Sequence, residues 1–410
     1  RHGPAPQSMA LRPQVCITSP EPLVSLALSR ESARVALGQS TGGLQLLSYQ
    51  AALRERQSAP ALLSSFSVHS APVRAVVFAK EESLCSGAAD GEVCLWDVAT
   101  DTEVWRTTGH SAALSRLSTR AVEDHLTPGQ RNFLVSGDDD GVLKMWDLRT
   151  RECVKELKHH TDYISGLTFG SGDNSNVMLA TSGDGTLSAV DLRKKGKLLG
   201  HSEHQEDELV SVAVMKRGKK VICGTGGGVL HIFSWDRWGD CSDRFPGHPS
   251  SVDALCPFDE DTLFTGSSDG LIRFVNILPN KLLGVLGNHK DLPVEGLFRG
   301  PGLTKGAVDG SGQLSANRVL ASLSHDDIVR IWDLKDFYDE TEESSDEGGN
   351  PGAAAVAGDE PDGDSDGEGA GERVESDADS PKGMKHSEDG DDDDDDADDA
   401  DDADDADDAD

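Results

Sequence analysis

The chain has 410 residues, of which 74 are acidic and 38 are basic, so its formal net charge is −36. This excess is local, because residues 339–410 hold 33 acidic and three basic side chains, whereas residues 1–338 hold 41 and 35. No apolar run approaches the ~18 residues of a membrane span, and the N-terminus lacks a secretory signal, which argues against a membrane or secreted protein. Seven widely spaced cysteines indicate reduced, intracellular thiols rather than a disulfide framework.

The first predicted elements lie at the N-terminus. We expect residues 1–10 to be a disordered leader, with Met9 as the natural start of the protein. Gln14–Thr18 (QVCIT) then alternates apolar and polar residues in the manner of a short β-strand.

One template recurs along the chain: small residues, a turn ending in Asp-Gly, and an alternating strand that closes on Trp-Asp. Full copies run over Ser86–Asp97, Ser136–Asp147 and Ser322–Asp333, and four weaker copies keep the same offset. The seven turn positions are residues 42, 91, 141, 185, 228, 270 and 327, with intervals of 42 to 57 residues. This spacing is close to the ~40–45 residues of WD-repeat blades. The pattern predicts an all-β, seven-bladed WD-repeat propeller, with loop insertions around residues 118–131 and 299–317.

Six units carry a histidine before their first strand, at His69, His110, His160, His204, His248 and His289. In this repeat family the imidazole typically bonds to the turn aspartate, which five units possess. Because these residues recur at one repeat position, we interpret them as structural rather than metal-binding or catalytic. The expected structural set is His69, Asp90, Trp96, His110, Asp140, Trp146, His160, Asp184, His248, Asp269, Asp326 and Trp332.

The last unit lacks a fourth strand, because the chain after Trp332 reads DLKDFYDETEESSDE without apolar alternation. An open propeller would expose unpaired strand edges, so the missing strand must come from elsewhere. Residues 14–18 are the spare candidate. We therefore predict a propeller over residues 11–338, with the outer strand of blade 7 from residues 14–18. Residues 339–410 are rich in Gly, Ala, Asp and Glu, and we predict a disordered acidic tail.

No motif points to catalysis, because no nucleophile stands beside a base and no carboxylate pair separates acid and base roles. Gly224–Gly228 (GTGGG) lacks the Gly-Lys-Ser/Thr ending of a phosphate loop and is interpreted as a hairpin turn. We expect no catalytic residue, cofactor or metal. Two basic clusters are candidates for RNA or phosphate contact, with solvated hairpin tips as the alternative. Their residues are Lys194, Lys195, Lys197, Lys216, Arg217, Lys219 and Lys220.

A longer stretch, Ser242–His289, carries a more specific likeness through SDRF at Ser242–Phe245 and an Asn-Ile-Leu-Pro-Asn turn at Asn276–Asn280. It resembles the WD repeat-containing protein 55 family, whose sixth blade reads through a similar turn. The resemblance implies a non-enzymatic scaffold of the nucleus and nucleolus that supports ribosomal RNA processing and ribosome biogenesis. Implied partners are ribosome-assembly factors, and the tail would engage basic proteins or act as a solubilising appendage. We expect a monomer within a larger complex.

One departure bears on localisation, because family members commonly carry a Lys/Arg-rich segment after the last blade and this chain turns directly acidic. The cytoplasm is therefore the alternative location. A rival mechanism rests on two WDxR-like boxes, which resemble those of substrate receptors for cullin-RING ubiquitin ligases. In that interpretation the adaptor docks on blades 3 and 4 through Trp146, Asp147, Arg149, Asp191 and Arg193.

Overall fold

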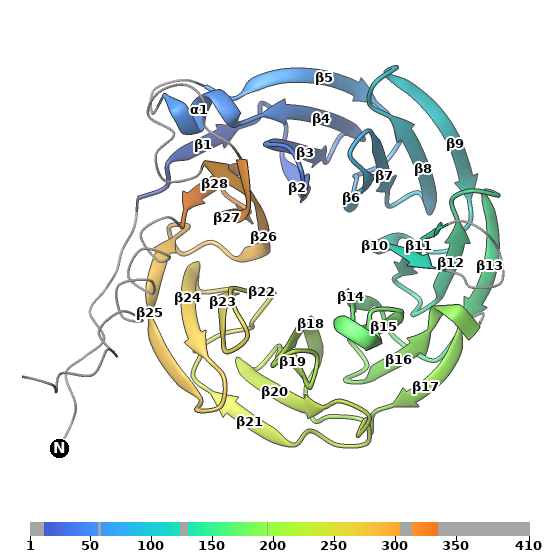
Figure 1. The fold of residues 1–410 in the computed structure, drawn as a ribbon, viewed down its shortest axis with the longest axis vertical. Coiled ribbons are helices and arrows are strands. Elements are labelled where there is room, and N and C mark those ends of the chain that lie inside the picture. Colours follow the sequence, from blue (N-terminus) through green and yellow to red (C-terminus); the bar gives the residue numbers. More distant parts are fainter. Residues whose placement is uncertain (1–11, 56–58, 124–129, 195, 304–313, 335–410) are drawn as a thin grey trace, which may run out of the picture. The chain divides into compact units, whose positions relative to one another are not determined.

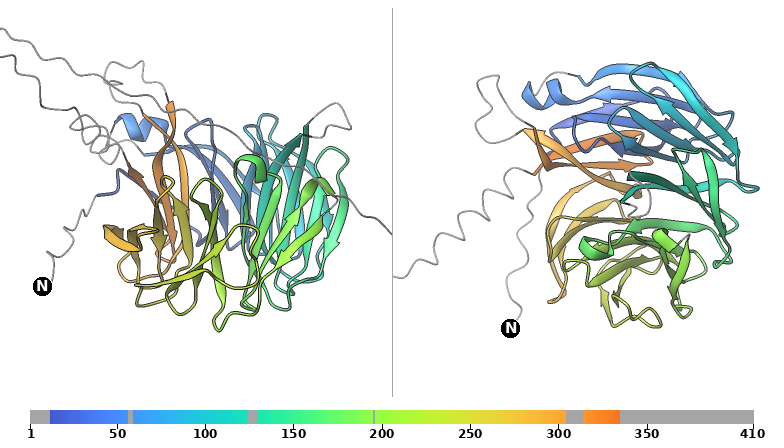
Figure 2. Two further views of the ribbon diagram at one scale, coloured as in Figure 1. Left: turned by 60° about the horizontal axis from the view of Figure 1, so that its bottom comes forward. Right: turned by 45° about the vertical axis from the view of Figure 1, so that its right-hand side comes forward.

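The computed structural model describes residues 12–55, 59–123, 130–194, 196–303 and 314–334. The chain divides into two units, residues 1–349 and 350–410, and the second lies outside the described residues. In the first unit, seven four-stranded sheets surround a common centre, as Figure 1 and the two further views of Figure 2 show. The predicted all-β, seven-bladed propeller is confirmed. The predictions for residues 1–10 and 339–410 concern residues outside the described ones.

Within each blade, neighbouring strands are antiparallel, and they follow one another from the centre of the ring to its rim (Figure 1). Blade 1 consists of β2 (Leu23–Leu28), β3 (Arg34–Gln39), β4 (Gly43–Ser48) and β5 (Ala61–Ser67), with the short helix α1 (Gln50–Arg54) between the last two. Blade 2 consists of β6 (Ala75–Lys80), β7 (Ser83–Gly87), β8 (Glu92–Asp97) and β9 (Thr102–Thr108). Blade 3 consists of β10 (Leu114–Glu123), β11 (Gln130–Asp138), β12 (Leu143–Asp147) and β13 (Glu152–Leu157).

The second half of the ring repeats this order, with 3₁₀ turns η1 (Gly172–Asn174) and η2 (Leu192–Lys194) in blade 4. Blade 4 consists of β14 (Ile164–Phe169), β15 (Val177–Ser182), β16 (Leu187–Asp191) and β17 (Lys197–His201). Blade 5 consists of β18 (Leu209–Met215), β19 (Lys220–Thr225), β20 (Val229–Ser234) and β21 (Asp243–Pro246). Blade 6 consists of β22 (Ala254–Pro257), β23 (Thr262–Gly266), β24 (Leu271–Asn276) and β25 (Lys281–Asn288).

Blade 7 joins the two ends of the propeller. It consists of β26 (Val294–Leu303), β27 (Leu314–Ser324), β28 (Ile328–Asp333) and the N-terminal strand β1 (Val15–Thr18). β1 pairs antiparallel with β28, with Val15 opposite Ile331 and Ile17 opposite Val329. The outer strand of blade 7 is therefore formed by residues more than 300 positions earlier in the chain.

The turn between the second and third strands of each blade requires a left-handed backbone. Residues 42, 91, 141, 185, 228 and 270 are glycines with φ between 75° and 87°, and Asp327 has a φ of 56° in blade 7. A Cβ on Gly91 would lie 2.5 Å from the backbone oxygen of His110 in the next loop. The turns therefore need glycine both for their backbone conformation and for close contact with the neighbouring blade.

The hydrophobic core is divided among the contacts between neighbouring blades. Between blades 7 and 1, for example, Ile17, Leu26, Val35 and Val329 are buried in one cluster. Each blade therefore buries apolar residues against its neighbours, as expected for repeats that cannot fold alone.

The two predicted loop insertions are wrong in part, because strands extend into them. β10 continues to Glu123 and β11 begins at Gln130, while β26 continues to Leu303 and β27 begins at Leu314.

All seven cysteines are free thiols, and burial raises the pKa of Cys85 to about 12. Among the described residues, no helix is long and apolar enough to cross a membrane.

Candidate functional site

Buried histidines tie five of the blades to their loops, and blade 3 shows the full arrangement. The Nδ1 of His110 lies 2.7 Å from Oδ2 of Asp138, and its Nε2 lies 2.6 Å from Oγ of Ser136. Trp146 donates from Nε1 to the same hydroxyl at 2.8 Å. A neutral imidazole that donates to Asp138 and accepts from Ser136 satisfies this network. The side chains thus connect the entry loop, the turn and the third strand of the blade.

In blade 3, the predicted aspartate partner of the histidine is wrong. His110 bonds to Asp138 rather than to the predicted Asp140, which is exposed. Asp138 also accepts the backbone N–H groups of Asp140 and Val142, at 3.1 and 2.8 Å. It therefore organises the turn and holds the imidazole at once, which leaves Asp140 outside the network.

In blade 6, the predicted pair of His248 and Asp269 is wrong. Asp269 accepts two hydrogen bonds from Arg273, at 3.0 and 2.5 Å, while His248 bonds to Oγ1 of Thr265 at 2.8 Å. Burial, together with the charge of Arg273, lowers the pKa of His248 to about 4. This histidine is therefore held neutral without a carboxylate partner among the described residues.

The remaining predicted pairs lie close together with different geometries. His289 approaches Asp326 at 3.2 Å, and Trp332 donates to Ser322 at 2.9 Å, as in blade 3. His69 lies 3.6 Å from Asp90, with Trp96 stacked on Phe66. His160 lies 3.5 Å from Asp184 and bonds to Thr186, which donates to that carboxylate.

In blade 5 the structure departs from the predicted histidine. His204 is exposed, and the buried position is filled by Gln205, whose backbone N–H donates to Gly185. The backbone N–H of His248 makes the equivalent bond to Gly228 in the next blade. Sequence reasoning missed Gln205 because the interval from the preceding turn glycine is 19 residues for His110, His160 and His289 but 20 residues for His248, so either neighbour fits.

One cluster has metal-ligand chemistry: His69, Glu92 and Cys94 bring their ligand atoms within 4.8 Å of one another. A guanidinium already lies there, because Arg106 hydrogen-bonds to Glu92. Burial raises the pKa of Cys94 to about 12, so the free thiol stays protonated at neutral pH. A divalent cation would have to displace Arg106, and we therefore assign His69 to its blade tie.

The WDxR-like boxes form turns at the ends of β12 and β16. Asp147 and Asp191 accept the backbone N–H groups of Arg149 and Arg193, each at 2.9 Å. Asp97 makes the same kind of turn in blade 2, accepting the backbone N–H of Ala99 at 2.9 Å. The aspartate of the box thus has a structural role that does not depend on the arginine.

Burial limits which box residues can contact a partner. Trp146, Asp147 and Asp191 are 4%, 5% and 1% exposed, so these predicted docking residues do not present a surface. The Arg149 side chain is 66% exposed and lies 3.8 Å from Asp147. The Arg193 side chain is 47% exposed, but it already forms two 3.2 Å hydrogen bonds to Asp191. Both arginine side chains therefore lie at the surface, and Arg193 already hydrogen-bonds to the aspartate of its own turn.

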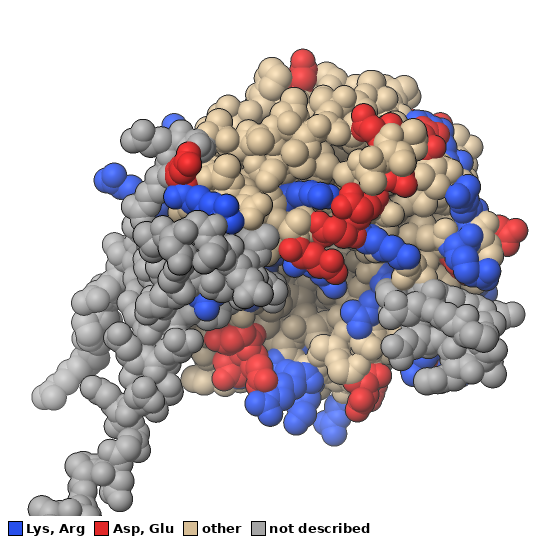
Figure 3. Space-filling view, turned by 45° about the horizontal axis from the view of Figure 1, so that its top comes forward, with Lys and Arg blue, Asp and Glu red and all other residues tan. Residues whose placement is uncertain are grey.

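The basic clusters are partly neutralised by neighbouring acids. Lys216 and Arg217 pair with Asp261 and Glu260 at 2.5 and 2.6 Å, across the contact of blades 5 and 6. Lys220 donates to two serine hydroxyls. Figure 3 shows the same mixture of basic and acidic side chains around a central hollow.

The other predicted contact residues include exposed lysines. Lys219 and Lys197 are exposed, and Lys194 lies 3.6 Å from Asp191 with 60% of its side chain exposed. Lys195 lies outside the described residues. The positive charge is therefore scattered along the described surface and interrupted by acids.

Comparison with known proteins places this architecture in a family. The family model described as WDR55 matches residues 16–337. WD repeat-containing protein 55 of Arabidopsis thaliana is 38% identical over 327 residues, which cover 78% of this chain and 82% of the relative. The Mus musculus protein of the same name is 35% identical, covering 65% and 62%. WD repeat-containing protein JIP5 of Coprinopsis cinerea is 39% identical over 59% of this chain and 56% of its own length. The chain therefore belongs to the WDR55 family of WD-repeat proteins.

Proposed function

We propose that this protein is a non-enzymatic interaction scaffold of the nucleus and nucleolus that supports ribosomal RNA processing and ribosome biogenesis. The observation that carries the proposal is family membership over the whole propeller, residues 16–337. The chemistry of the described part supports a binding role, because the recurrent histidines and acids are engaged in ties between loops and strands. Ribosome-assembly factors are the proposed partners, and the acidic tail offers charge for basic proteins.

Depletion tests this role. Cells that lose the protein should accumulate ribosomal RNA precursors, because an assembly scaffold brings factors to the precursor before its cleavage. Re-expression of the chain should restore the mature species, which controls for indirect effects on growth. Normal precursor levels after complete depletion would contradict the proposal. A tagged chain should concentrate in the nucleolus, whereas exclusive retention in the cytoplasm would contradict the proposed location.

A second candidate function is supported by one observation, the exposure of Arg149 and Arg193 at equivalent turns of neighbouring blades. These guanidiniums would form the contact with a cullin-RING ligase adaptor, since planar guanidiniums suit bidentate bonding. The ion pair of Arg193 with Asp191 would have to open or be shared on docking.

A further inference from the structure

The inner strands of all seven blades enclose a cavity of about 570 Å³ at the centre of the ring. This volume lies within the range of ~300–1,000 Å³ that ligand-binding clefts occupy. Its lining combines apolar side chains such as Leu26, Leu117 and Phe298 with a few charged ones. A central channel is inherent to a propeller, so the charged side chains of its lining, rather than its volume, bear on binding.

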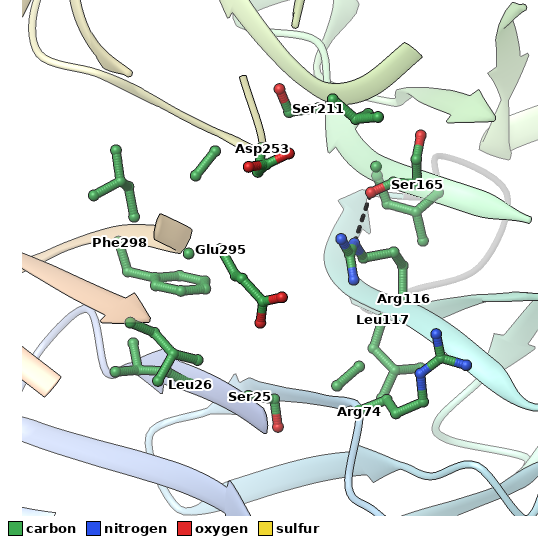
Figure 4. Close-up of a pocket in the computed structure, with 18 of the residues that line it drawn as sticks. Ser25, Leu26, Arg74, Arg116, Leu117, Ser165, Ser211, Asp253, Glu295 and Phe298 are labelled. Carbon is green, nitrogen blue, oxygen red and sulfur yellow. Dashed lines mark hydrogen bonds between the residues drawn. The ribbon is translucent and has the colours of Figure 1, made fainter. Parts of the chain in front are cut away.

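The charged side chains are divided between two walls. Arg74 and Arg116 come from blades 2 and 3, whereas Asp253 and Glu295 come from blades 6 and 7. Figure 4 shows the carboxylates of Glu295 and Asp253 across the cavity from the guanidinium of Arg116. A ligand in this space therefore meets an acidic wall on one side and a hydrogen-bond donor on the other.

Within the described ranges, neither carboxylate of the acidic wall forms a direct ion pair with Lys or Arg, and the charge of Glu295 opposes the lowering of the Arg116 pKa by burial. Asp253 accepts hydrogen bonds from the hydroxyls of Ser251 and Ser268, each at 2.5 Å. Glu295 lies 2.6 Å from Nε2 of His325, and its side chain remains 39% exposed. Both carboxylates are therefore available to a cation that enters the cavity.

The two guanidinium groups of the opposite wall already have partners, a carboxylate for Arg74 and backbone carbonyl oxygens for Arg116. Arg74 pairs with Asp139 at 2.6 Å, and Arg116 donates to the backbone oxygens of Ser165 and Ser115. The acceptors that Arg116 uses in this environment are thus peptide carbonyl oxygens. A peptide segment supplies such carbonyls along its backbone, whereas a simple cation does not.

The rim of the cavity at blades 4 and 5 adds an aromatic ring that hydrogen-bonds to a carboxylate. Tyr163 lines the cavity and donates from its hydroxyl to Glu208 at 3.1 Å. Glu208 lies in the loop that enters β18. An aromatic ring next to carboxylates is a favourable surface for a lysine or arginine side chain.

We propose that the central cavity binds a peptide segment of a partner protein and receives one of its arginine or lysine side chains against Asp253 and Glu295. The peptide backbone faces Arg116, which donates to its carbonyl oxygens. An acidic ligand is disfavoured, because the carboxylates of Asp253 and Glu295 would repel it and Arg116 already donates to backbone carbonyl oxygens. This inference deepens the proposed scaffold function by naming the chemistry of a partner, but binding at the cavity can be tested without reference to ribosome assembly.

Affinity selection on the immobilised full-length chain tests the proposal. The probe is a pool of blocked octapeptides with one central arginine and random uncharged flanks, and the reference pool carries citrulline in its place. Citrulline keeps the shape of arginine and removes its charge. The affinity of the most enriched sequence is then measured by fluorescence anisotropy at about 0.15 M salt, where long-range attraction to the acidic tail is screened.

Two variants of the chain and one altered peptide decide the outcome. Asp253→Asn with Glu295→Gln should bind the selected peptide about tenfold more weakly or worse, as should the wild type with the citrulline peptide. The matched control, Asp101→Asn with Glu152→Gln, removes the same charge from two exposed positions elsewhere and should bind like the wild type. Undiminished binding by the cavity variant, or no enrichment of arginine over citrulline, would overturn the proposal. Either result would leave the depletion test of the scaffold role unaffected.

Discussion

The closing strand offers the sharpest test of the propeller, through the substitution Ile17→Ala. Ile17 is 3% exposed and packs in the cluster that joins blades 7 and 1. Truncating a buried isoleucine to alanine costs about 2–5 kcal/mol, through lost burial and the cavity left behind. An unfolding entropy of roughly 2.1 cal mol⁻¹ K⁻¹ per residue over roughly 320 residues converts this cost to a fall of about 3–8 °C in melting temperature.

Differential scanning calorimetry of the full chain measures the effect, and the same strand provides a matched control. Cys16 lies between Val15 and Ile17 on the outward face and is exposed, so Cys16→Ala should change stability by only about 0.5 kcal/mol. The two variants alter adjacent residues of one strand and differ in the face that they alter. If Ile17→Ala melts with the wild type, β1 does not close the ring and the account of blade 7 is refuted.

Three further predictions concern the adaptor contact, a turn and acid stability. Arg149→Lys with Arg193→Lys should weaken capture of a cullin-RING adaptor roughly thirtyfold without lowering the melting temperature; undiminished capture would exclude these boxes as the contact. Gly91→Ala should destabilise by more than Gly172→Ala in urea titrations, because both have positive φ but only the first meets backbone within 4 Å. Burial lowers the pKa of His289 to about 4, so the unfolded chain takes up the proton first, and stability should fall as pH drops from about 6.5 towards 4. Equal urea midpoints at pH 7 and 5, where carboxylates stay ionised, would contradict that neutral histidine.

The turn positions could be predicted because their requirement is local. A left-handed residue in a tight hairpin selects glycine, and the residues at 42, 91, 141, 185, 228 and 270 all have positive φ. Asp327 takes the same conformation in blade 7, which aspartate tolerates better than most residues. The propeller fold could be predicted from these turn positions, because the interval between successive turns is close to the length of one blade.

The partners of the histidines were harder to predict, because several residues of one turn lie within reach of one imidazole. Asp138 and Asp140 are two positions apart, and only the three-dimensional path of the turn directs Asp138 to His110. In blade 6, Arg273 lies four residues after Asp269 and binds this turn aspartate, so that His248 bonds to Thr265 instead. Competition between neighbouring charges is not visible in the spacing of a motif.

The central cavity could not be found from the sequence, because its charged walls come from distant parts of the chain. Arg74 and Glu295 each stand at the start of an inner strand, in blades 2 and 7. Each follows a buried valine at the same place in its unit, Val73 or Val294, but this pattern does not show which charges face one another. Closure of the ring alone brings these residues to one space.

Affinity purification of the tagged full-length chain from nuclear extract, at its natural expression level and with quantitative mass spectrometry, tests the scaffold role most directly. The account predicts that ribosome-assembly factors and ribosomal proteins are recovered in defined proportion to the chain, above a control purification from untagged cells. Recovery of a cullin-RING adaptor without assembly factors, or of neither group, would contradict the proposed role in ribosome biogenesis.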